Sequence, residues 1–160
     1  MTDMTFAGGN NIAGGYKLRC VPVVGVQSLP TPATSGPMNA PPLTLKSGFT
    51  WINIYGTEQT KDYNEGESET DNGPLWAVST SLFLPGDSAD QRRTLLQMSR
   101  HTFIVECQDN VGLWRRLGTL TEGLSFAYKF TIDAQAGGQR GALLTFSGNL
   151  TQIPPLLTGQ

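Results

Sequence analysis

Residues 75–84 read LWAVSTSLFL, and this stretch decides the fold because its larger side chains recur at every second position. Successive side chains of a β-strand point to opposite faces, so a period of two predicts a strand with one buried face. The buried face would carry Trp76, Val78, Thr80, Leu82 and Leu84. The opposite face would carry small side chains, namely Ala77, Ser79 and Ser81.

Similar alternation on both sides of this stretch predicts further strands. Residues 49–55 alternate with bulk on both faces, which indicates one strand. Residues 102–108 and 113–118 flank a connection with good turn chemistry and predict a β-hairpin. Residues 124–133 and 142–150 predict a second hairpin joined by a glycine-rich linker.

One short helix is predicted directly after residues 75–84. Ser88 and Gln91 have the spacing of a capping box, which begins a helix after the strand ends. Leu95, Leu96 and Met98 would form its apolar side.

The composition favours strands over helices in a single domain spanning residues 1–160. Charged residues make up 15% of the chain, and 19 Gly and 10 Pro supply turn formers. We therefore predict a mainly β protein, a β-sandwich or partly closed barrel with one short flanking α-helix and a long extended N-terminal arm. Residues 49–150 would form the β-rich core.

The N-terminal third contains two segments that predict extended arms or loops, residues 1–15 and 27–48. The first is rich in glycine, and the second contains QSLPTPATSGPMNAPP at 27–42. Between them, residues 16–24 predict a strand in which Pro22 favours a sheet edge or a bulge. The prolines predicted to contact other subunits are Pro30, Pro32, Pro37, Pro41 and Pro42.

Charge and cysteine content argue against several classes of function. A net charge of −2 gives no basic footprint for sequence-specific nucleic-acid binding. No apolar run is long enough to span a membrane, and the first residues do not resemble a secretion signal, so we expect folding in the cytosol. Cys20 and Cys107 lack the spacing of a zinc or redox site, so we expect buried thiols and no metal or cofactor.

Residues 58–71 concentrate negative charge and predict a solvated acidic hairpin or loop. They include Glu65, Glu67, Glu69 and Asp71 but lack the calcium-loop pattern D-x-[DN]-x-[DN]-G with its distal Glu. In a tube that passes DNA, such an acidic surface would repel phosphates and prevent the duplex from sticking.

Two alternatives to a structural role come from the histidine and the tryptophans. His101 is the only histidine, and a hydrolase using His101 and Asp109 is the weaker alternative because no nucleophile motif accompanies them. A carbohydrate-binding β-sandwich module is the stronger one, because three tryptophans could form an aromatic platform. Core packing is the preferred interpretation for Trp51 and Trp76.

Trp114 is left open between core and surface because two arginines follow it. Trp and Arg are enriched at protein–protein interfaces, so Trp114, Arg115 and Arg116 are predicted interface residues.

Two runs, FIVECQDNVGLWRRLG at 103–118 and GALLTFSG at 141–148, resemble the C-terminal hairpins of tailed-bacteriophage tail proteins. The resemblance covers the last third of the chain. It implies a β-sandwich or barrel with a flanking helix that forms rings through sheet-edge pairing and extended arms.

The function expected from the resemblance is that of a non-enzymatic virion structural protein, a phage tail component that self-assembles into rings with other virion proteins. Assembly would take place in the host cytoplasm and the final location would be the virion. The sequence departs from the pattern because no single long apolar-alternating hairpin is evident to line a lumen. Tail tube, tail-end terminator and head-tail connector therefore stay open.

Overall fold

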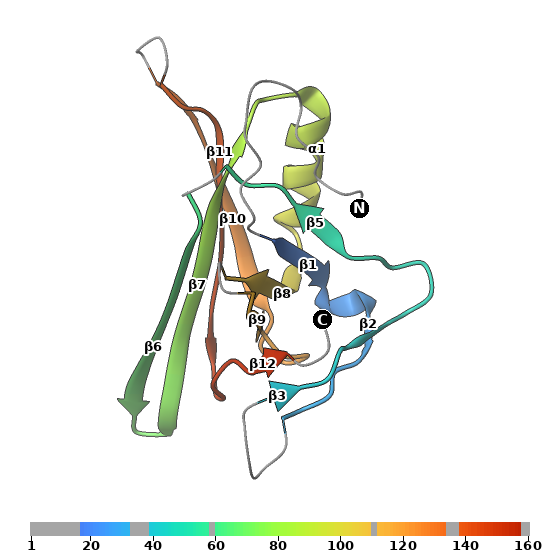
Figure 1. Cartoon of the computed structure of the whole chain (residues 1–160), viewed down its shortest axis with the longest axis vertical. Coiled ribbons are helices and arrows are strands. Elements are labelled where there is room, and N and C mark those ends of the chain that lie inside the picture. The colour runs from blue at the N-terminus through green and yellow to red at the C-terminus, as the bar shows by residue number, and fades with distance from the viewer. Residues whose placement is uncertain (1–16, 33–38, 58–59, 110–111, 134–137, 158–160) are drawn as a thin grey trace.

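The computed structural model describes residues 17–32, 39–57, 60–109, 112–133 and 138–157. The predictions for residues 1–15 and for Pro37 lie outside these ranges. In the described part, strands dominate and one α-helix is present, so the predicted mainly β class with one short helix is confirmed. Figure 1 shows two long hairpins that project from the body in opposite directions.

The strands and helices have the following bounds. The N-terminal elements are β1 Leu18–Pro22, the 3-10 helix η1 Val23–Gly25, β2 Val26–Ser28, β3 Asn39–Ala40, β4 Thr44–Leu45 and β5 Ile52–Ile54. They are followed by β6 Asp62–Thr70, β7 Gly73–Pro85, α1 Ala89–Met98, β8 Thr102–Gln108 and β9 Trp114–Leu117. The C-terminal strands are β10 Leu124–Ile132, β11 Arg140–Leu150 and β12 Leu156–Leu157.

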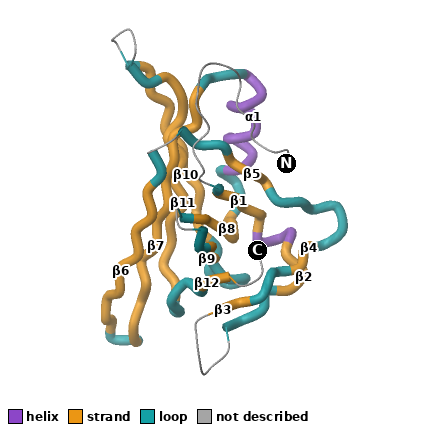
Figure 2. Tube along the Cα trace, in the orientation of Figure 1, coloured by secondary structure: helices purple, strands orange, loops and turns teal. Residues whose placement is uncertain are grey.

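Among the described residues, ten of these strands form one mixed sheet. Its order is β3-β12-β9-β8-β10-β11-β7-β6, and β1 pairs with both β8 and β5. The β12–β3 pair is parallel, and the other pairs of this sheet are antiparallel. β2 and β4 form a separate two-stranded sheet. In Figure 2 the long strands lie together on one side of the molecule, and the short strands form the other side.

The alternation in residues 75–84 is realised in β7. Its predicted buried face includes Val78, Thr80, Leu82 and Leu84, each at most 2% exposed, with Trp76 partly buried against the same core. Both predicted C-terminal hairpins are present as β8–β9 and β10–β11. The inward side chains of β7, β10 and β11 meet there, and Phe103, Phe126 and Phe146 form the aromatic centre.

The helix α1 begins as predicted. The Ser88 hydroxyl accepts a hydrogen bond from the Gln91 backbone N–H at 3.2 Å. Leu95 and Met98 are fully buried in the core, whereas Leu96 is 52% exposed, so the prediction for Leu96 is wrong. Leu96 lies one position after Leu95, and adjacent helix residues do not share a face.

Several predicted boundaries are wrong. The strand predicted at residues 49–55 is only Ile52–Ile54, because Phe49 belongs to a turn in which its N–H bonds to the Lys46 carbonyl. Residues 16–24 include the whole of β1 and the start of η1. Near the C-terminus, β12 pairs with β9 and β3.

Pro22, predicted to mark a sheet edge or a bulge, lies at the end of a strand. β1 is an interior strand, but Pro22 is its last residue and lies opposite Phe103 of β8, beyond the part that pairs with β5. A proline there interrupts no hydrogen bonds between β1 and β5.

Cys20 and Cys107 are buried free thiols, as predicted. They lie on the paired strands β1 and β8 but are offset by two residues, because Cys20 is opposite Val105 and Cys107 is opposite Leu18.

Candidate functional site

Four long strands form an antiparallel layer whose outer edges, as far as the described residues show, have no paired strand over most of their length. The order is β10, β11, β7 and β6, with β6 last in the sheet. β10 pairs with β8 only at Leu124 and Ser125. Among the described residues, the rest of β10 therefore pairs with β11 alone. A free strand edge presents backbone N–H and C=O groups that another chain can pair with.

The middle of the outward face of this layer consists mainly of small, uncharged side chains, and the neighbouring row of Phe83, Leu143 and Lys129 is larger. The strand registers define three adjacent rows across it: Asp62, Ser81, Thr145 and Ala127; Asn64, Ser79, Ser147 and Ser125; and Gly66, Ala77 and Asn149. Asp62 is the one charged residue in these rows. Such a surface is smooth, because no long side chain rises from it over the width of four strands.

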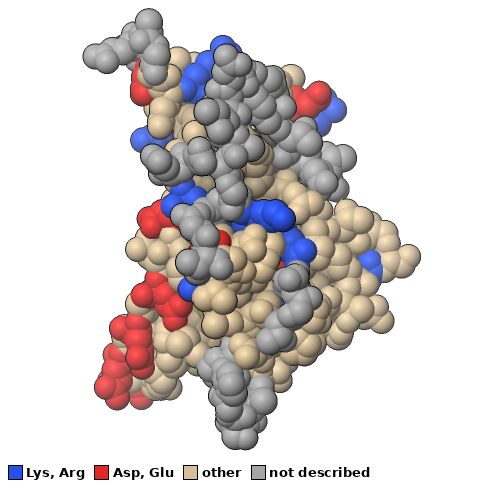
Figure 3. Space-filling view, in the orientation of Figure 1, with Lys and Arg blue, Asp and Glu red and all other residues tan. Residues whose placement is uncertain are grey.

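Residues 62–70 form the edge strand β6, which pairs with β7 as a hairpin, so the structure has the hairpin of the predicted hairpin or loop, and Asp71 follows the end of β6. An extended backbone is favoured here because β7 offers a full ladder of backbone partners. Glu65, Glu67 and Glu69 alternate with Asn64 and therefore lie on the face opposite the small-residue rows. All three are exposed, and acidic side chains gather along the lower edge in Figure 3.

A buried ionic row crosses three neighbouring strands on the other side of the molecule. Arg19 of β1 lies opposite Glu106 of β8, and Glu106 lies opposite Arg116 of β9. Arg19 contacts Glu106 Oε2 at 2.7 Å, and Arg116 Nε donates to Oε1 at 3.0 Å. Glu106 is completely buried and Arg116 is 2% exposed. One buried carboxylate therefore serves two guanidinium groups; Arg116 is buried, whereas the Arg19 side chain is 21% exposed.

The tryptophans do not form a shared platform. The Arg19 guanidinium lies 4.6 Å from the Trp51 ring centre and 4.7 Å from that of Trp114. Arg19 thus occupies a face of each indole, in the geometry of a cation–π contact. Trp76 packs against the main core instead. An exposed coplanar pair, which the carbohydrate-binding alternative needs, is not present among these three side chains.

Arg116 connects the proline-rich segment and the C-terminal segment to the sheet. Its Nη2 donates to the Pro41 carbonyl at 3.0 Å, and its backbone N–H donates to the Pro155 carbonyl at 3.1 Å. The sequence predicted an intersubunit contact for Arg116, whereas the structure buries it inside the chain. Burial lowers the pKa of Arg116, although the neighbouring Glu106 opposes this effect.

A cavity of about 40 Å³ lies beside Arg116. The residues that line it include Pro30, Pro32, Arg116, Leu150 and Ile153. The structure therefore places two of the predicted contact prolines near Arg116. Pro42 is exposed and lies after β3.

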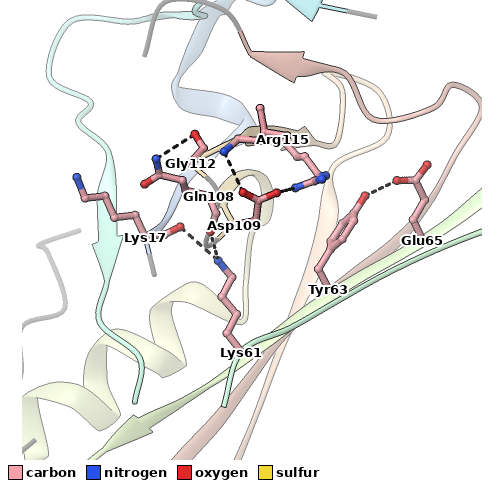
Figure 4. Close-up of polar contacts among 9 residues, drawn as sticks. Lys17, Lys61, Tyr63, Glu65, Gln108, Asp109, Gly112 and Arg115 are labelled. Carbon is pink, nitrogen blue, oxygen red and sulfur yellow. Dashed lines mark hydrogen bonds and ion pairs between the residues drawn. The ribbon is translucent and has the colours of Figure 1, made fainter. Parts of the chain in front are cut away.

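A second polar cluster joins the start of β6 to the turn after β8, as Figure 4 shows. Lys61 Nζ donates to the carbonyls of Lys17 and Gln108, each at 3.3 Å. Arg115 pairs with Asp109 at 2.7 Å, and its guanidinium lies 5.6 Å from the Tyr63 ring centre. Burial lowers the pKa of Lys61 to about 8. The cluster ties three segments together.

Trp114 and Arg115, the other two predicted interface residues, are half-buried in contacts within the chain. The Asp109 hydrogen bond raises the pKa of Arg115. Burial, together with the hydrogen bond to Glu65, raises the pKa of Tyr63.

His101 and Asp109 do not meet. They flank opposite ends of β8, a strand of seven residues, so their backbones are separated by roughly 26 Å. His101 lines an open recess of about 380 Å³ with Ser99, Arg100 and Ser125. In the described part of the chain, no serine or cysteine hydrogen-bonds with the His101 side chain.

Neither a metal cluster nor a membrane helix is found in the described ranges. No group of three His, Cys, Asp or Glu side chains there could hold a metal ion. No helix in the same ranges is long and apolar enough to cross a bilayer.

No family model, curated protein sequence or solved structure was found to match this chain.

Sequence reasoning missed the ionic row and the free edge of β10. A signal for the first was available, because Glu106 interrupts the otherwise apolar run at 103–107, and a charge there needs a buried partner. No comparable signal marks the free edge, because strand order depends on contacts between distant parts of the chain.

Proposed function

We propose that this chain is a non-enzymatic structural protein of a virion, a tail component of a tailed bacteriophage that assembles into homo-oligomeric rings. The observation that carries the proposal is the four-stranded layer whose edges at β6 and β10 are largely unpaired among the described residues. Long free edges favour association, and monomeric proteins usually shorten, cover or charge them. β10 is a long edge of this kind, whereas β6 is charged by its three glutamates.

The directions of the two edges are compatible with pairing between copies. The three pairings inside the layer are antiparallel, so β10 and β6 run in opposite directions. When a second copy is placed beside the first in the same orientation, its β10 is antiparallel to β6 of the first. Such a contact joins two different surfaces of the chain. Copies related by the same rotation form a closed ring when the last copy meets the first.

The smooth face supports this arrangement because a ring formed through these edges would turn one face of every layer toward its centre. The small-residue rows suit an inner wall, since they offer little charge to bind a passing polymer. Glu65, Glu67 and Glu69 lie on the other face of β6. This arrangement assigns these acids to contacts between subunits, in place of the DNA path expected from the sequence.

Disulfide trapping tests the edge contact directly. Asp62 of β6 and Ala127 of β10 lie in the same row but are three strand spacings apart in one copy, roughly 14 Å. Ala127 lies beyond the two residues of β10 that pair with β8. A disulfide needs Cα atoms closer than about 7 Å. The double variant Asp62→Cys with Ala127→Cys should therefore form a ladder of covalent oligomers on oxidation.

The controls are the two single-cysteine variants, for which no ladder is expected beyond a dimer. A second pair, Asn64→Cys with Ala127→Cys, covers a register shifted by two residues. Light scattering and negative-stain images of the unmodified chain should show rings at high concentration. A monomer at every concentration, with no ladder from either pair, would contradict the proposal.

A further inference from the structure

The helix α1 follows the free part of β10, residues 126–132, which lies beyond the two residues that pair with β8. Near the start of α1, the Arg92 guanidinium lies 4.3 Å from the ring centre of Phe130 (Figure 1). Just after its end, Arg100 lines the open recess together with Phe126. The buried side chains of α1 belong to the same core cluster as Phe126, so the helix is on the core side of the layer.

The two arginines beside the free part of β10 can each take an acid from outside. Arg100 is exposed, and in the described part of the chain no carboxylate pairs with it. Arg92 is exposed too, and Asp87 occupies its Nε and Nη2. A guanidinium group carries five N–H donors, so the Nη1 of Arg92 is still available.

The exposed glutamates of β6 have the opposite charge and a matching spacing. Glu65, Glu67 and Glu69 all lie on the core side of β6. The Tyr63 hydroxyl donates to Glu65, and the side chains of Glu67 and Glu69 have no partner among the described residues. Glu65 and Glu69 are four strand residues apart, about 13 Å. The interval from Phe130 to Phe126 is the same.

Antiparallel pairing of β6 with β10 of the next copy matches both ends of these two rows at once. When Glu65 lies opposite Phe130, Glu69 lies opposite Phe126, because the two strands run in opposite directions. The acids and α1 are then on the same side of the continuous sheet. This register pairs residues 63–69 with residues 126–132, and it leaves Leu124 and Ser125 to β8.

The same register displaces neighbouring copies along the strands. Asp62 is level with Ala127 inside one copy, whereas this register sets Ser68 of the next copy against Ala127, a displacement of six residues. A sheet that closes into a cylinder has tilted strands and a stagger in its register. The level register has no stagger, and it would set Asn64 against Ser125, which already pairs with β8.

We propose that the arginines beside the free part of β10 bind the glutamates of β6 from the next copy. Arg100 takes Glu69, and Arg92, alongside Asp87, takes Glu65. The inference rests on the edge contact between β6 and β10 proposed above, and it specifies the register and the charged groups of that contact. The glutamates then select β10 as their partner strand, because an edge without nearby cations would leave them unpaired.

A charge exchange between Arg100 and Glu69 tests the ionic contact. The measurement is the concentration at which half of the chain is assembled, by light scattering. Arg100→Glu and Glu69→Arg should each raise this midpoint about tenfold, because like charges then face each other. The chain that carries both substitutions should return to within about twofold of the unmodified chain, since every contact again joins opposite charges.

Lys17→Glu is the matched control for the change in net charge. Lys17 is exposed, and its carbonyl accepts from the Gln108 N–H, at the end of β8 away from the recess. This variant should keep the midpoint within about twofold. Combined with Glu69→Arg, it should not restore assembly. Raising the sodium chloride concentration should weaken assembly of the unmodified chain, because salt screens exposed ion pairs.

A cysteine pair tests the register. Ser68→Cys with Ala127→Cys should form the covalent ladder faster than Asp62→Cys with Ala127→Cys, because the staggered register sets Ser68 opposite Ala127 of the next copy. Inside one copy, Ser68 and Ala127 are six residues and three strand spacings apart, roughly 25 Å. That distance is too long for a disulfide within the chain.

The outcomes separate the two proposals. Rings with an unchanged midpoint in both single charge variants, or no recovery in the double variant, would overturn the ionic contact and leave the edge contact standing. A faster ladder from the Asp62 pair than from the Ser68 pair would overturn the register. A monomeric unmodified chain that gives no ladder would overturn both proposals.

Discussion

The two sides of the molecule satisfy their polar groups in different ways. Around β8, β9 and β12, charged and backbone groups find partners within the chain, as Arg116 does with Glu106, Pro41 and Pro155. In the four-stranded layer, the backbone edges of β6 and β10 lack partners among the described residues over most of their length. The difference indicates that the first side has a mainly internal role, and the second is the side through which we propose that copies associate.

The largest effect on stability is expected from Glu106→Gln. The substitution leaves two guanidinium groups near a neutral amide in a buried site, and breaking a buried ion pair in this way typically costs about 3–5 kcal/mol. Urea unfolding monitored by tryptophan fluorescence measures the change. Asp87→Asn breaks the exposed pair between Asp87 and Arg92 and should alter the unfolding free energy little. A loss below about 1 kcal/mol for Glu106→Gln would mean that the row is not closed to water.

A smaller effect is expected from Leu82→Ala, which tests the core side of the layer. Leu82 is 1% exposed, and removing such a side chain costs about 2–5 kcal/mol through lost burial and cavity formation. Ser81→Ala changes the adjacent residue on the smooth face and should stay within about 0.5 kcal/mol. Equal effects of the two substitutions on the unfolding midpoint would show that both faces of β7 are covered in the isolated chain.

The smallest effect concerns Lys61, which links the two sides. Its pKa is about 8 in the folded chain, below the ordinary value of 10.5, because burial disfavours the charged form. Between these pH values the unfolded chain binds more protons, so the Lys61 contribution makes the unfolding free energy rise with pH. The stability of the unmodified chain relative to Lys61→Met should therefore be constant below pH 8 and increase from pH 8 to 9.

Urea titrations of both proteins at intervals from pH 7 to 9 measure this difference. The cysteines Cys20 and Cys107 have raised pKa values and begin to destabilise the fold near pH 9, but they do so in both proteins and largely cancel. If the unfolding free energies of the two proteins change with pH in parallel, the Lys61 ammonium group stays hydrated in the folded chain.

The parts of the fold predicted from the sequence are those governed by local periodicity. The alternation in residues 75–84 and the Ser88 cap describe β7 and α1 well, because the side-chain period and the cap act within a few residues. The acidic strand β6 was predicted as a hairpin or loop. Its composition is unfavourable for a strand, and pairing with β7 overrides that propensity.

The candidate site was predicted less well, because it depends on which strands are neighbours. Arg115 and Arg116 are adjacent in sequence, yet one pairs with Asp109 near the β8–β9 turn and the other enters the buried row. Because they are adjacent on a strand, their side chains point to opposite faces of the sheet. The sequence alone does not tell which of these faces is covered by other parts of the chain. The proline segment was expected to reach away from the body, whereas Arg116 holds its Pro41 carbonyl.

The glutamates of β6 also disfavour the pairing of two copies through their β6 strands. If two copies met through β6 alone, antiparallel pairing would set the three glutamates of one copy against those of the other on the same face. Like charges directly opposite on neighbouring strands are destabilising. Symmetric dimers through β6 are thereby disfavoured, which leaves the β6 edge available for the pairing with β10 proposed above.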